Sequence, residues 1–359
     1  MVRRKTQPHP HSRPAGAAVD LALQGGGSHG AFTWGVLDRL LEDGRFVIDG
    51  VSGTSAGALN AGVMATGFAR GGADGARAAL RAFWLDVAGG GSSFGSFAAL
   101  EGQAPWAGVS PFSIQGNPFL SLLTPWLKLF SPYQFNPLDI NPLRDITRRH
   151  VDEYAMRDGP MKLFVSATTV TTGQPEVFMG KRLSIDALLA SACLPQIFKA
   201  VHIDGVAYWD GGYGGNPAIW PLIYHTDATD VVLVKIDPLR REALPDTAAE
   251  IADRVNEITF NAGLAAEMRA IHFVRRLLRE ERIDKARYKS LRLHMVADDG
   301  ALAALPPSSK LQTDRAFLLK LHGLGQAAAQ RWLDGDGAKV GIESTLDIER
   351  TFLAPRRVG

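Results

Sequence analysis

The sequence predicts an α/β protein with a mostly parallel central sheet flanked by helices. Two observations support this fold class. Short apolar runs rich in β-branched residues recur along the chain, separated by segments with helical periodicity. The first two runs each end in a glycine-rich loop followed at once by a helical pattern. These two strands are therefore expected to be parallel, with their carboxyl ends side by side.

Composition limits the class of protein. The 359 residues suffice for one large domain or two smaller ones, and 46% hydrophobic against 21% charged residues is typical of a globular chain. A formal charge of +2 gives no overall basic field, and no nucleic-acid-binding motif is recognised. We therefore expect no nucleic-acid partner.

The cysteine count and the N-terminus bear on location. A single cysteine, Cys193, excludes an internal disulfide and fits a reducing compartment. Residues 1–16 carry positive charge but lack the apolar core of a signal peptide, so we expect a disordered tail. No run of about 18 strongly apolar residues predicts a membrane span. A cytoplasmic protein is expected.

The order of the first strands and helices can be predicted from the sequence. Residues 19–23 form a strand that leads into the glycine loop of residues 25–30. Apolar residues at helical spacing follow until Asp43 and Gly44 end that helix. A second strand begins at Phe46 and stops abruptly at Gly-Thr-Ser-Ala-Gly, residues 53–57, where an alanine-rich helical pattern begins. The order is strand, loop, helix, strand, sharp turn, helix.

Ser55, at the centre of this G-x-S-x-G turn, is the candidate nucleophile. A serine between a strand and a helix sits on a strained elbow that lifts its hydroxyl clear of the sheet, and small flanking residues prevent collisions. The helix that follows directs its free N–H groups and positive dipole end toward the serine oxygen. An ordinary glycine-rich turn is the alternative, but the flanking strand and helix favour the nucleophile.

The glycine loop has two interpretations. It matches G-x-G-x-x-G, and Asp49 lies about 20 residues further on, where a dinucleotide site would place its ribose-binding acid. The serine turn, however, follows Asp49 within a few residues and would occupy the crevice that the nucleotide needs. Consecutive unhindered backbone N–H groups are equally what an oxyanion hole requires, and this interpretation is favoured.

Residues 89–142 differ in character from their surroundings. A short amphipathic helix, residues 80–87, precedes them, and no charged residue occurs from 102 to 127. A loop this long and apolar is unusual in a compact domain. A lid over the site, with peripheral membrane contact, is favoured over a flexible linker.

Asp210 is the candidate base. Residues 201–208 predict a hairpin with an Asp-Gly turn, and its second strand delivers Asp210, Gly211 and Gly212. The two glycines leave room for a close neighbour, although a turn-forming Asp-Gly would be the default for an isolated motif. The other elements expected around it are strands at 161–170, 176–179 and 230–237 and a helix at 183–192.

Beyond Pro245 the chain is expected to be mainly helical. A long helix carries apolar residues from Ile251 to Leu278 on one face and arginines at 275, 276, 279 and 282 on the other. A solvated surface helix is favoured over one that binds anionic lipid. A strand at 291–296 and a helix near 311–333 follow. The nine histidines are scattered, and no metal-ligand cluster is seen.

Three motifs stand in fixed order: GGGSHG after the first strand, GTSAG after the second and DGG after the hairpin. Together they resemble the patatin-like phospholipase family over about residues 18–236. The segment Ala-Ser-Ala-Cys-Leu-Pro, residues 190–195, is also similar to the family's approach to its DGG motif. The resemblance implies a three-layer fold with a catalytic domain at 17–240, an insertion at 89–142 and a C-terminal extension at 241–359.

The resemblance also implies a chemistry. Ser55 would be the nucleophile and Asp210 the base of a Ser-Asp dyad that cleaves lipid acyl esters through an acyl-enzyme, without cofactor or metal. An oxyanion hole would be formed by backbone N–H groups of Gly25, Gly26 and Gly27, helped by Ala56. The supporting motif residues are Ser28, His29, Gly30, Gly53, Gly57, Gly211 and Gly212.

One residue departs from the family's pattern. His29 occupies a position where the family commonly has arginine or lysine. We expect its side chain to orient the oxyanion loop rather than to shuttle protons, so that arginine would be tolerated there.

Several alternatives stay open. A histidine triad could use His272, His294 or His322, which follow Asp210 in chain order, although the serine elbow comes earlier than such folds usually place it. A dinucleotide- or lipid-binding module without catalysis is the non-enzymatic alternative. Among substrates, phospholipid, lysophospholipid, neutral lipid, polyhydroxyalkanoate and acyl thioester are not distinguished. The sequence does not indicate an oligomeric state.

Overall fold

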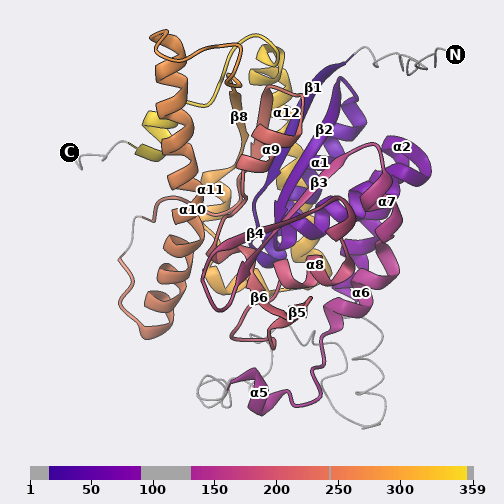
Figure 1. Cartoon of the computed structure of the whole chain (residues 1–359). Coiled ribbons are helices and arrows are strands. Elements are labelled where there is room, and N and C mark those ends of the chain that lie inside the picture. Colours follow the sequence, from indigo (N-terminus) through magenta and orange to yellow (C-terminus); the bar gives the residue numbers. More distant parts are fainter. Residues whose placement is uncertain (1–15, 90–130, 242–243, 354–359) are drawn as a thin grey trace, which may run out of the picture.

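A computed structural model describes residues 16–89, 131–241 and 244–353. The chain forms three layers around one eight-stranded sheet, in the order β5-β6-β3-β2-β1-β7-β8, with β4 also paired to β3 (Figure 1). The five strands from β3 to β8 in that order are parallel: β3 (Lys162–Thr169), β2 (Phe46–Thr54), β1 (Ala17–Leu23), β7 (Asp230–Val234) and β8 (Arg292–Val296).

Three further strands join one side of the sheet through antiparallel pairs. They are β4 (Pro175–Met179), β5 (Val201–Ile203) and β6 (Val206–Asp210). The mostly parallel sheet predicted from the sequence is confirmed, and so is the hairpin before Asp210. The strand near 230–237 is shorter than expected and ends at Val234, because the N–H groups of Ile236 and Asp237 donate to Gln24 Oε1 rather than to a neighbouring strand.

Helices cover both faces of the sheet. On one face lie α1 (Gly30–Asp43), α2 (Ala56–Ala88) and α12 (Arg315–Asp334), which bury Leu21 and Leu23 of β1. On the other face α9 (Trp220–His225) and α10 (Ala248–Arg279) bury Ala22 of the same strand. Alternate residues of β1 therefore enter opposite cores, as expected of a strand buried on both sides.

The connections contain shorter elements. The short α-helices are α5 (Pro132–Phe135), α6 (Pro142–His150), α7 (Glu153–Asp158), α8 (Ile185–Ser191) and α11 (Asp299–Ala303). The 3-10 turns are η1 (Gly27–His29), η3 (Gly180–Arg182), η4 (Gly211–Tyr213), η5 (Pro307–Leu311) and η6 (Asp336–Lys339); a π turn, η7 (Glu349–Leu353), ends the described chain. Among these, η1, η4, η5 and α8 surround the site.

The C-terminal part of the chain completes this domain. Residues beyond 240 supply β8, the edge strand of the sheet, together with α10, α11 and α12. The glycines of α1 and α12 allow close contact: a methyl group on Gly35 would overlap the His322 carbonyl, and one on Gly325 would overlap that of Phe32. A boundary at residue 240 would thus fall inside one continuous sheet.

Two sequence-based expectations concern residues that are not described. The tail at 1–15 and residues 90–130, which include the uncharged middle of the predicted lid, lie outside the described residues. Of the predicted insertion, residues 131–142 are described and carry α5. No helix in the described part of the chain is long and apolar enough to cross a membrane.

Candidate active site

Ser55 occupies a strained turn between β2 and α2. Its φ of 53° and ψ of −122° lie in a region that non-glycine residues rarely adopt. The neighbouring backbone approaches closely, since a methyl group on Gly57 would overlap the Leu23 carbonyl and one on Gly25 would collide with Ser55 Cβ. The glycines of both motifs are therefore required for the elbow to pack beside β1.

The segment before the hairpin positions both Ser55 and Asp210. The Ser191 hydroxyl oxygen at the end of α8 accepts a hydrogen bond from the Ser55 backbone N–H at 2.8 Å. Two residues later, the carbonyl of Cys193 accepts from the Asp210 N–H, also at 2.8 Å. The stretch at 190–195, noted in the sequence only as similar to the family, thus connects the elbow to the DGG motif.

Strand register brings Asp210 to the same edge as Ser55. Thr54 pairs with Ser166 of β3, and the next residue of β3, Ala167, pairs with Asp210. The chain then crosses back toward β2, where the Thr54 hydroxyl donates to the Gly215 carbonyl at 2.8 Å. Asp210 and Ser55 are therefore held on either side of β3 by backbone pairing.

The environment of Asp210 suits a base. Its side chain is 1% exposed, and Oδ1 accepts the Gly212 N–H at 2.8 Å. Oδ2 is buried and makes no regular hydrogen bond within the described chain. Burial raises the pKa of Asp210 to about 7, against the lowering effects of the Gly212 N–H and the Ser55 side chain. A carboxyl group with this pKa is partly ionised near neutrality.

The glycine loop lies beside the elbow, and its N–H groups are not equivalent. Gly25 donates its N–H to Asn216 Oδ1 at 2.6 Å, and its carbonyl accepts from Asn216 Nδ2 at 3.3 Å. The Gly25 N–H is therefore already occupied. Gly27 has a φ of 59°, which turns the loop into η1. At the start of α2, the N–H of Ala56 belongs to the first turn, which has no intrahelical acceptor.

His29 anchors this loop as a neutral group. It is fully buried, and burial, followed by the positive charges of Lys310 and Arg241, lowers its pKa to about 3. His29 Nε2 lies 2.8 Å from Ser309 Oγ, and that hydroxyl donates to the Pro306 carbonyl at 2.6 Å. Because the hydroxyl proton is already donated, His29 carries its proton on Nε2 and donates to Ser309.

A cation from the C-terminal part of the chain stands next to the loop. Lys310 of η5 pairs with Asp237 at 2.6 Å, and the carbonyl of Lys310 leaves no room for a side chain at Gly27. Lys310 also lines the cavity that contains Ser55. The positive charge that His29 does not carry is therefore present at the loop, supplied by a residue far away in the sequence.

An apolar cavity of about 110 Å³ opens at Ser55. Its walls come from α2, α6, the segment after α8 and η5. Ser28, Ala56 and Thr313 border it near the serine, and its apolar lining consists of Leu59, Phe83, Trp84, Val87, Leu143, Ile146, Ala192, Leu194, Ile197, Phe198 and Leu311. The cavity suits an apolar group attached to a reacting centre at Ser55.

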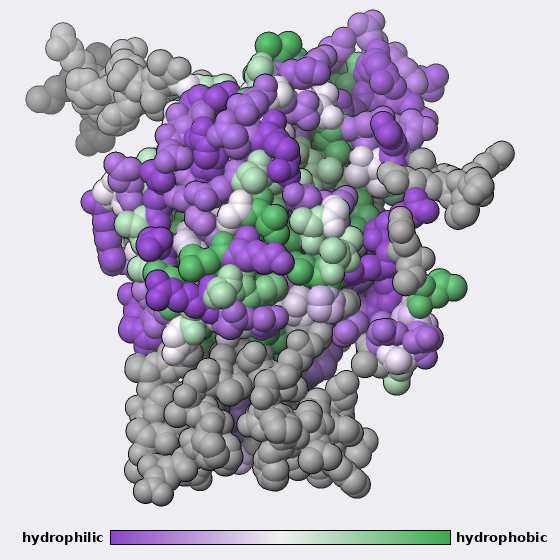
Figure 2. All heavy atoms as spheres, turned by 180° about the vertical axis from the view of Figure 1, so that it is seen from behind, coloured by the Kyte–Doolittle hydropathy of each residue, from purple (hydrophilic) through white to green (hydrophobic). Residues whose placement is uncertain are grey.

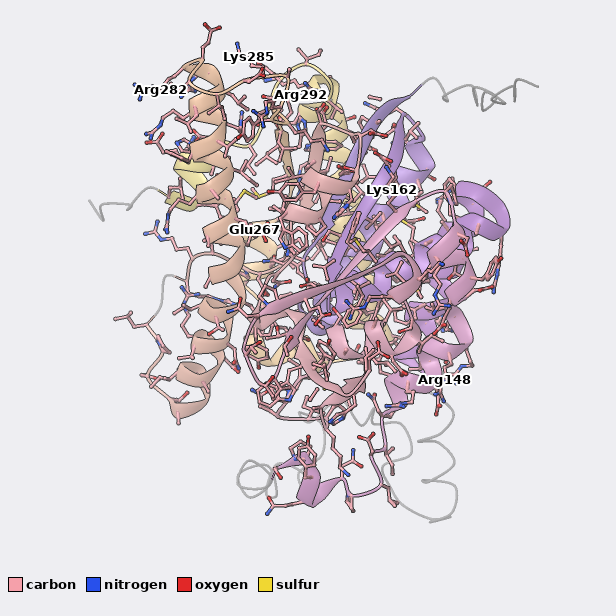
Figure 3. All side chains as sticks on the ribbon, in the orientation of Figure 1. Arg148, Lys162, Glu267, Arg282, Lys285 and Arg292 are labelled. Atoms are coloured by element: carbon pink, nitrogen blue, oxygen red, sulfur yellow. The ribbon has the colours of Figure 1, made fainter. Side chains whose placement is uncertain are left out.

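The residues of the alternative interpretations lie elsewhere. His294 is buried in β8, 3.0 Å from Asp230, and His322 lies 3.1 Å from Asp38, while His272 lines a separate cavity on α10. Asp49 lies toward the start of β2, at the amino end of the sheet. There it accepts the N–H of Asp227 and pairs with Lys162, which Figure 3 labels on β3. None of these contacts brings a histidine or Asp49 to Ser55.

Three contributors to the site were missed in the sequence. Ser191, Asn216 and Lys310 contact the elbow, the glycine loop and Asp237, respectively. Ser191 lies within the recognised 190–195 segment and could have been named from it. Asn216 and Lys310 had no local signal, because only the folded chain brings η5 and the turn after η4 to the loop.

The described residues contain no cluster of three or more histidine, cysteine or acidic side chains able to hold a metal ion. The groups brought together at the elbow are a serine, a buried carboxyl group and backbone N–H groups. A strand, a strained serine turn and a helix within an α/β fold form the local geometry of enzymes that use a nucleophilic serine.

Comparison with known proteins gives the family. The chain belongs to the patatin-like phospholipase family, whose sequence model matches residues 21–223, more than half of the chain. This places it among lipid acyl hydrolases in general. No curated protein matches the chain significantly.

Two solved structures are similar to this chain. VipD from Legionella pneumophila is 15% identical, with 95% of this chain and 73% of that chain covered and a TM-score of 0.35. ExoU, in complex with SpcU from the type III secretion system of Pseudomonas aeruginosa, is 14% identical, with 95% and 58% covered and a TM-score of 0.33.

Proposed function

We propose that the chain hydrolyses carboxylic esters of lipids, of the phospholipase A or lysophospholipase type, through a dyad of Ser55 and Asp210. The observation that carries this proposal is the buried Asp210 Oδ2. This oxygen is left without a regular hydrogen bond, and the Asp210 carboxyl group interacts with the side chain of a serine on a strained elbow. No histidine of the described chain makes a contact with Asp210 or Ser55 in its place.

The reaction follows from these positions. Ser55 Oγ attacks the acyl carbonyl carbon while its proton passes to Asp210 Oδ2. The resulting oxyanion is stabilised by the backbone N–H groups of Gly26, Gly27 and Ala56, since the Gly25 N–H is already engaged with Asn216. When the tetrahedral intermediate collapses, the alcohol leaves with the proton from Asp210.

The acyl-enzyme is hydrolysed by the same groups. Asp210 takes a proton from water as the water oxygen attacks the acyl carbon, and Ser55 recovers that proton as the free acid leaves. The near-neutral pKa of Asp210 serves both directions, because the group must accept a proton from serine and give it back to the leaving oxygen.

The cavity supports an acyl substrate. Its apolar walls, Phe83, Trp84 and Ile146 among them, lie next to Ser55 and would hold the hydrocarbon chain of the ester. Lys310 lines the same cavity, with its carbonyl against Gly27 and its ammonium group paired with the buried Asp237. The apolar walls favour a lipid ester over a polar one.

Exposed apolar side chains near the site support contact with a lipid surface. Around α5, Tyr133, Leu138 and Ile140 are 57%, 79% and 43% exposed. The Tyr133 hydroxyl accepts from the Ala200 N–H at 3.3 Å, which places this segment beside the hairpin of the site. Leu138→Asp should therefore reduce binding to phosphatidylcholine vesicles. The matched control is Ile342→Asp, since Ile342 is 75% exposed near the amino end of β7.

The function is tested by ester hydrolysis with purified protein. Ser55→Ala should abolish turnover of phospholipid, lysophospholipid and a soluble short-chain ester, whereas Ser290→Ala, at an exposed serine outside the site, should not. A survey of chain length, head group, neutral lipid, polyhydroxyalkanoate and thioester then selects the substrate. Retained hydrolysis by the Ser55→Ala variant would reject the proposal.

A further inference from the structure

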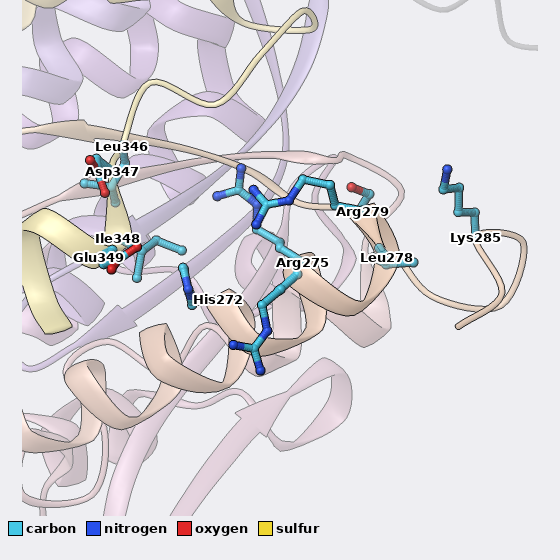
Figure 4. Close-up of a pocket in the computed structure, with 11 residues that line it drawn as sticks. His272, Arg275, Leu278, Arg279, Lys285, Leu346, Asp347, Ile348 and Glu349 are labelled. Atoms are coloured by element: carbon cyan, nitrogen blue, oxygen red, sulfur yellow. The ribbon is translucent and has the colours of Figure 1, made fainter. Parts of the chain in front are cut away.

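A second and larger cavity, of about 640 Å³, lies at the C-terminal end of α10. Its walls are the last turns of α10, the loop that follows and the chain before η7 (Figure 4). We call it the α10 cavity. Its lining consists of His272, Arg275, Arg276, Leu278, Arg279, Lys285, Ser290, Leu346, Asp347, Ile348 and Glu349.

Two arginines in this cavity have no anionic partner among the described residues. Arg275 is half-buried, and the guanidinium groups of Arg275 and Arg279 extend into the same space in Figure 4. No carboxylate of the described chain forms an ion pair with either of them. Burial, followed by the charge of Arg279, lowers the pKa of Arg275. A half-buried guanidinium beside a second, exposed one is unfavourable without an anion between them.

The other charges of the cavity do not compensate for this pair. Arg276 approaches Glu280 at 3.9 Å, and Lys285 pairs with Glu281 at 3.1 Å. Of the two lining carboxylates, Asp347 accepts the Arg350 N–H at 3.0 Å, and neither it nor Glu349 pairs with Arg275 or Arg279 within the described chain. The lining contains four permanent cations and two carboxylates, so it has an excess of positive charge.

The rest of the chain offers few anions. The segments that are not described contain only two acidic residues, Glu101 and Glu242. The favourable interaction of basic residues with the C-terminal dipole of α10 explains Arg276 and Arg279 in the last turn, but not a half-buried arginine one residue before them. An anion from outside the chain would supply the missing negative charge beside Arg275 and Arg279.

We infer that the α10 cavity binds a soluble anion carrying two or three phosphoryl groups. Each guanidinium presents a planar fork of N–H donors that matches phosphoryl oxygens, and two side by side require a ligand with more than one such group. The buried Leu278, Leu346 and Ile348 beneath them exclude water and strengthen the attraction.

The position of the cavity favours a soluble ligand over a lipid head group. Phe260 of α10 contacts Tyr213 at the catalytic end, with ring centroids 4.9 Å apart. Arg276 lies 16 residues further along this helix, about 24 Å away at 1.5 Å per residue. Figure 3 shows Arg282, Lys285 and Arg292 at the upper end, and in Figure 2 that end is largely hydrophilic. A membrane at the catalytic end would not reach the cavity.

The test is calorimetric titration of the full chain with inorganic tripolyphosphate, pyrophosphate and orthophosphate, alongside the melting temperature. We expect saturable binding that is tightest for tripolyphosphate and raises Tm. Arg275→Gln and Arg279→Gln should each weaken tripolyphosphate binding at least about tenfold. The matched control is Arg282→Gln, because Arg282 is 71% exposed, pairs with Glu280 and does not line the cavity.

Several results would overturn the inference. They are the absence of saturable binding, an equal loss in the Arg282→Gln variant, or citrate binding as tightly as tripolyphosphate, which would point to carboxylates. Should Arg275→Gln fail to fold, the exposed Arg279→Gln variant decides. Binding that depends on these arginines but occurs only on vesicles containing phosphoinositide would assign the cavity to a lipid instead. Ester hydrolysis does not enter any of these outcomes.

Discussion

Replacing Asp210 by asparagine should abolish catalysis and, at the same time, stabilise the protein above neutral pH. The folded chain buries this carboxyl group and raises its pKa from 3.8 to about 7. Ionising it therefore costs more in the folded than in the unfolded state. The penalty is absent below about pH 4, grows as the pH rises toward 7 and is constant above that. Asparagine keeps the shape and the acceptor for Gly212 but does not ionise.

The size of the expected stabilisation by Asp210→Asn follows from the shift in the Asp210 pKa. A difference of about three pKa units corresponds to about 4 kcal/mol at 1.36 kcal/mol per unit. With an unfolding entropy of about 2.1 cal/mol/K per residue, this is about 5 °C in Tm for a chain of this length. Asp20 and Glu267 are also buried, with pKa values raised to about 7, so only the difference between variant and parent isolates Asp210.

The assay compares Tm and urea midpoints of the parent and the Asp210→Asn variant at pH 3, 5 and 8. Asp49→Asn is a control of opposite sign, because hydrogen bonds from Asp227 and Lys162 lower the pKa of Asp49 despite its partial burial. That variant should lose stability more at pH 8 than at pH 3. If the increase in Tm of the Asp210→Asn variant over the parent is no larger at pH 8 than at pH 5, Asp210 is not a dehydrated carboxyl group and the argument fails.

Three further predictions concern the site. Below pH 7, kcat/KM should fall about tenfold per pH unit as Asp210 becomes protonated, and a flat profile from pH 5 to 8 would exclude it as the base. Ser191→Ala should lower kcat about tenfold with little change in KM, because the Ser55 N–H loses its acceptor; an effect on KM alone would assign Ser191 to substrate binding. His29→Arg should lower Tm by several degrees, because it buries a charge near Lys310 and Arg241. An unchanged Tm with full activity would instead support the expectation from the sequence that arginine is tolerated at position 29.

The elements of the fold that are determined by residues close together in the sequence were predicted correctly. The strand-loop-helix order around the glycine loop, the G-x-S-x-G turn and the hairpin before Asp210 are each encoded within a few residues. Short elements such as α6 and α7 were not predicted, because their nine and six residues span too few turns for a helical period to stand out in the sequence.

The supporting residues of the site could be predicted less well. Asn216 reaches Gly25 from 191 positions away, and Ser309 reaches His29 from 280 positions away. The spacing of residues does not encode such contacts, which exist only once the layers have packed. The same holds for Lys310, whose charge beside the glycine loop changes the expected consequence of placing arginine at position 29.

The central claim is that Ser55 is a nucleophile activated by Asp210, and covalent labelling tests it most directly. A fluorophosphonate probe reacts when serine oxygen attacks phosphorus and fluoride leaves, so peptide mass mapping reports the attacking residue. We expect modification of Ser55 in the parent and no modification in the Ser55→Ala variant. The labelling rate of the parent should rise with pH, and the midpoint of this rise should lie near the Asp210 pKa of about 7. Labelling of a different serine, or an unchanged rate in the Asp210→Asn variant, would contradict the account.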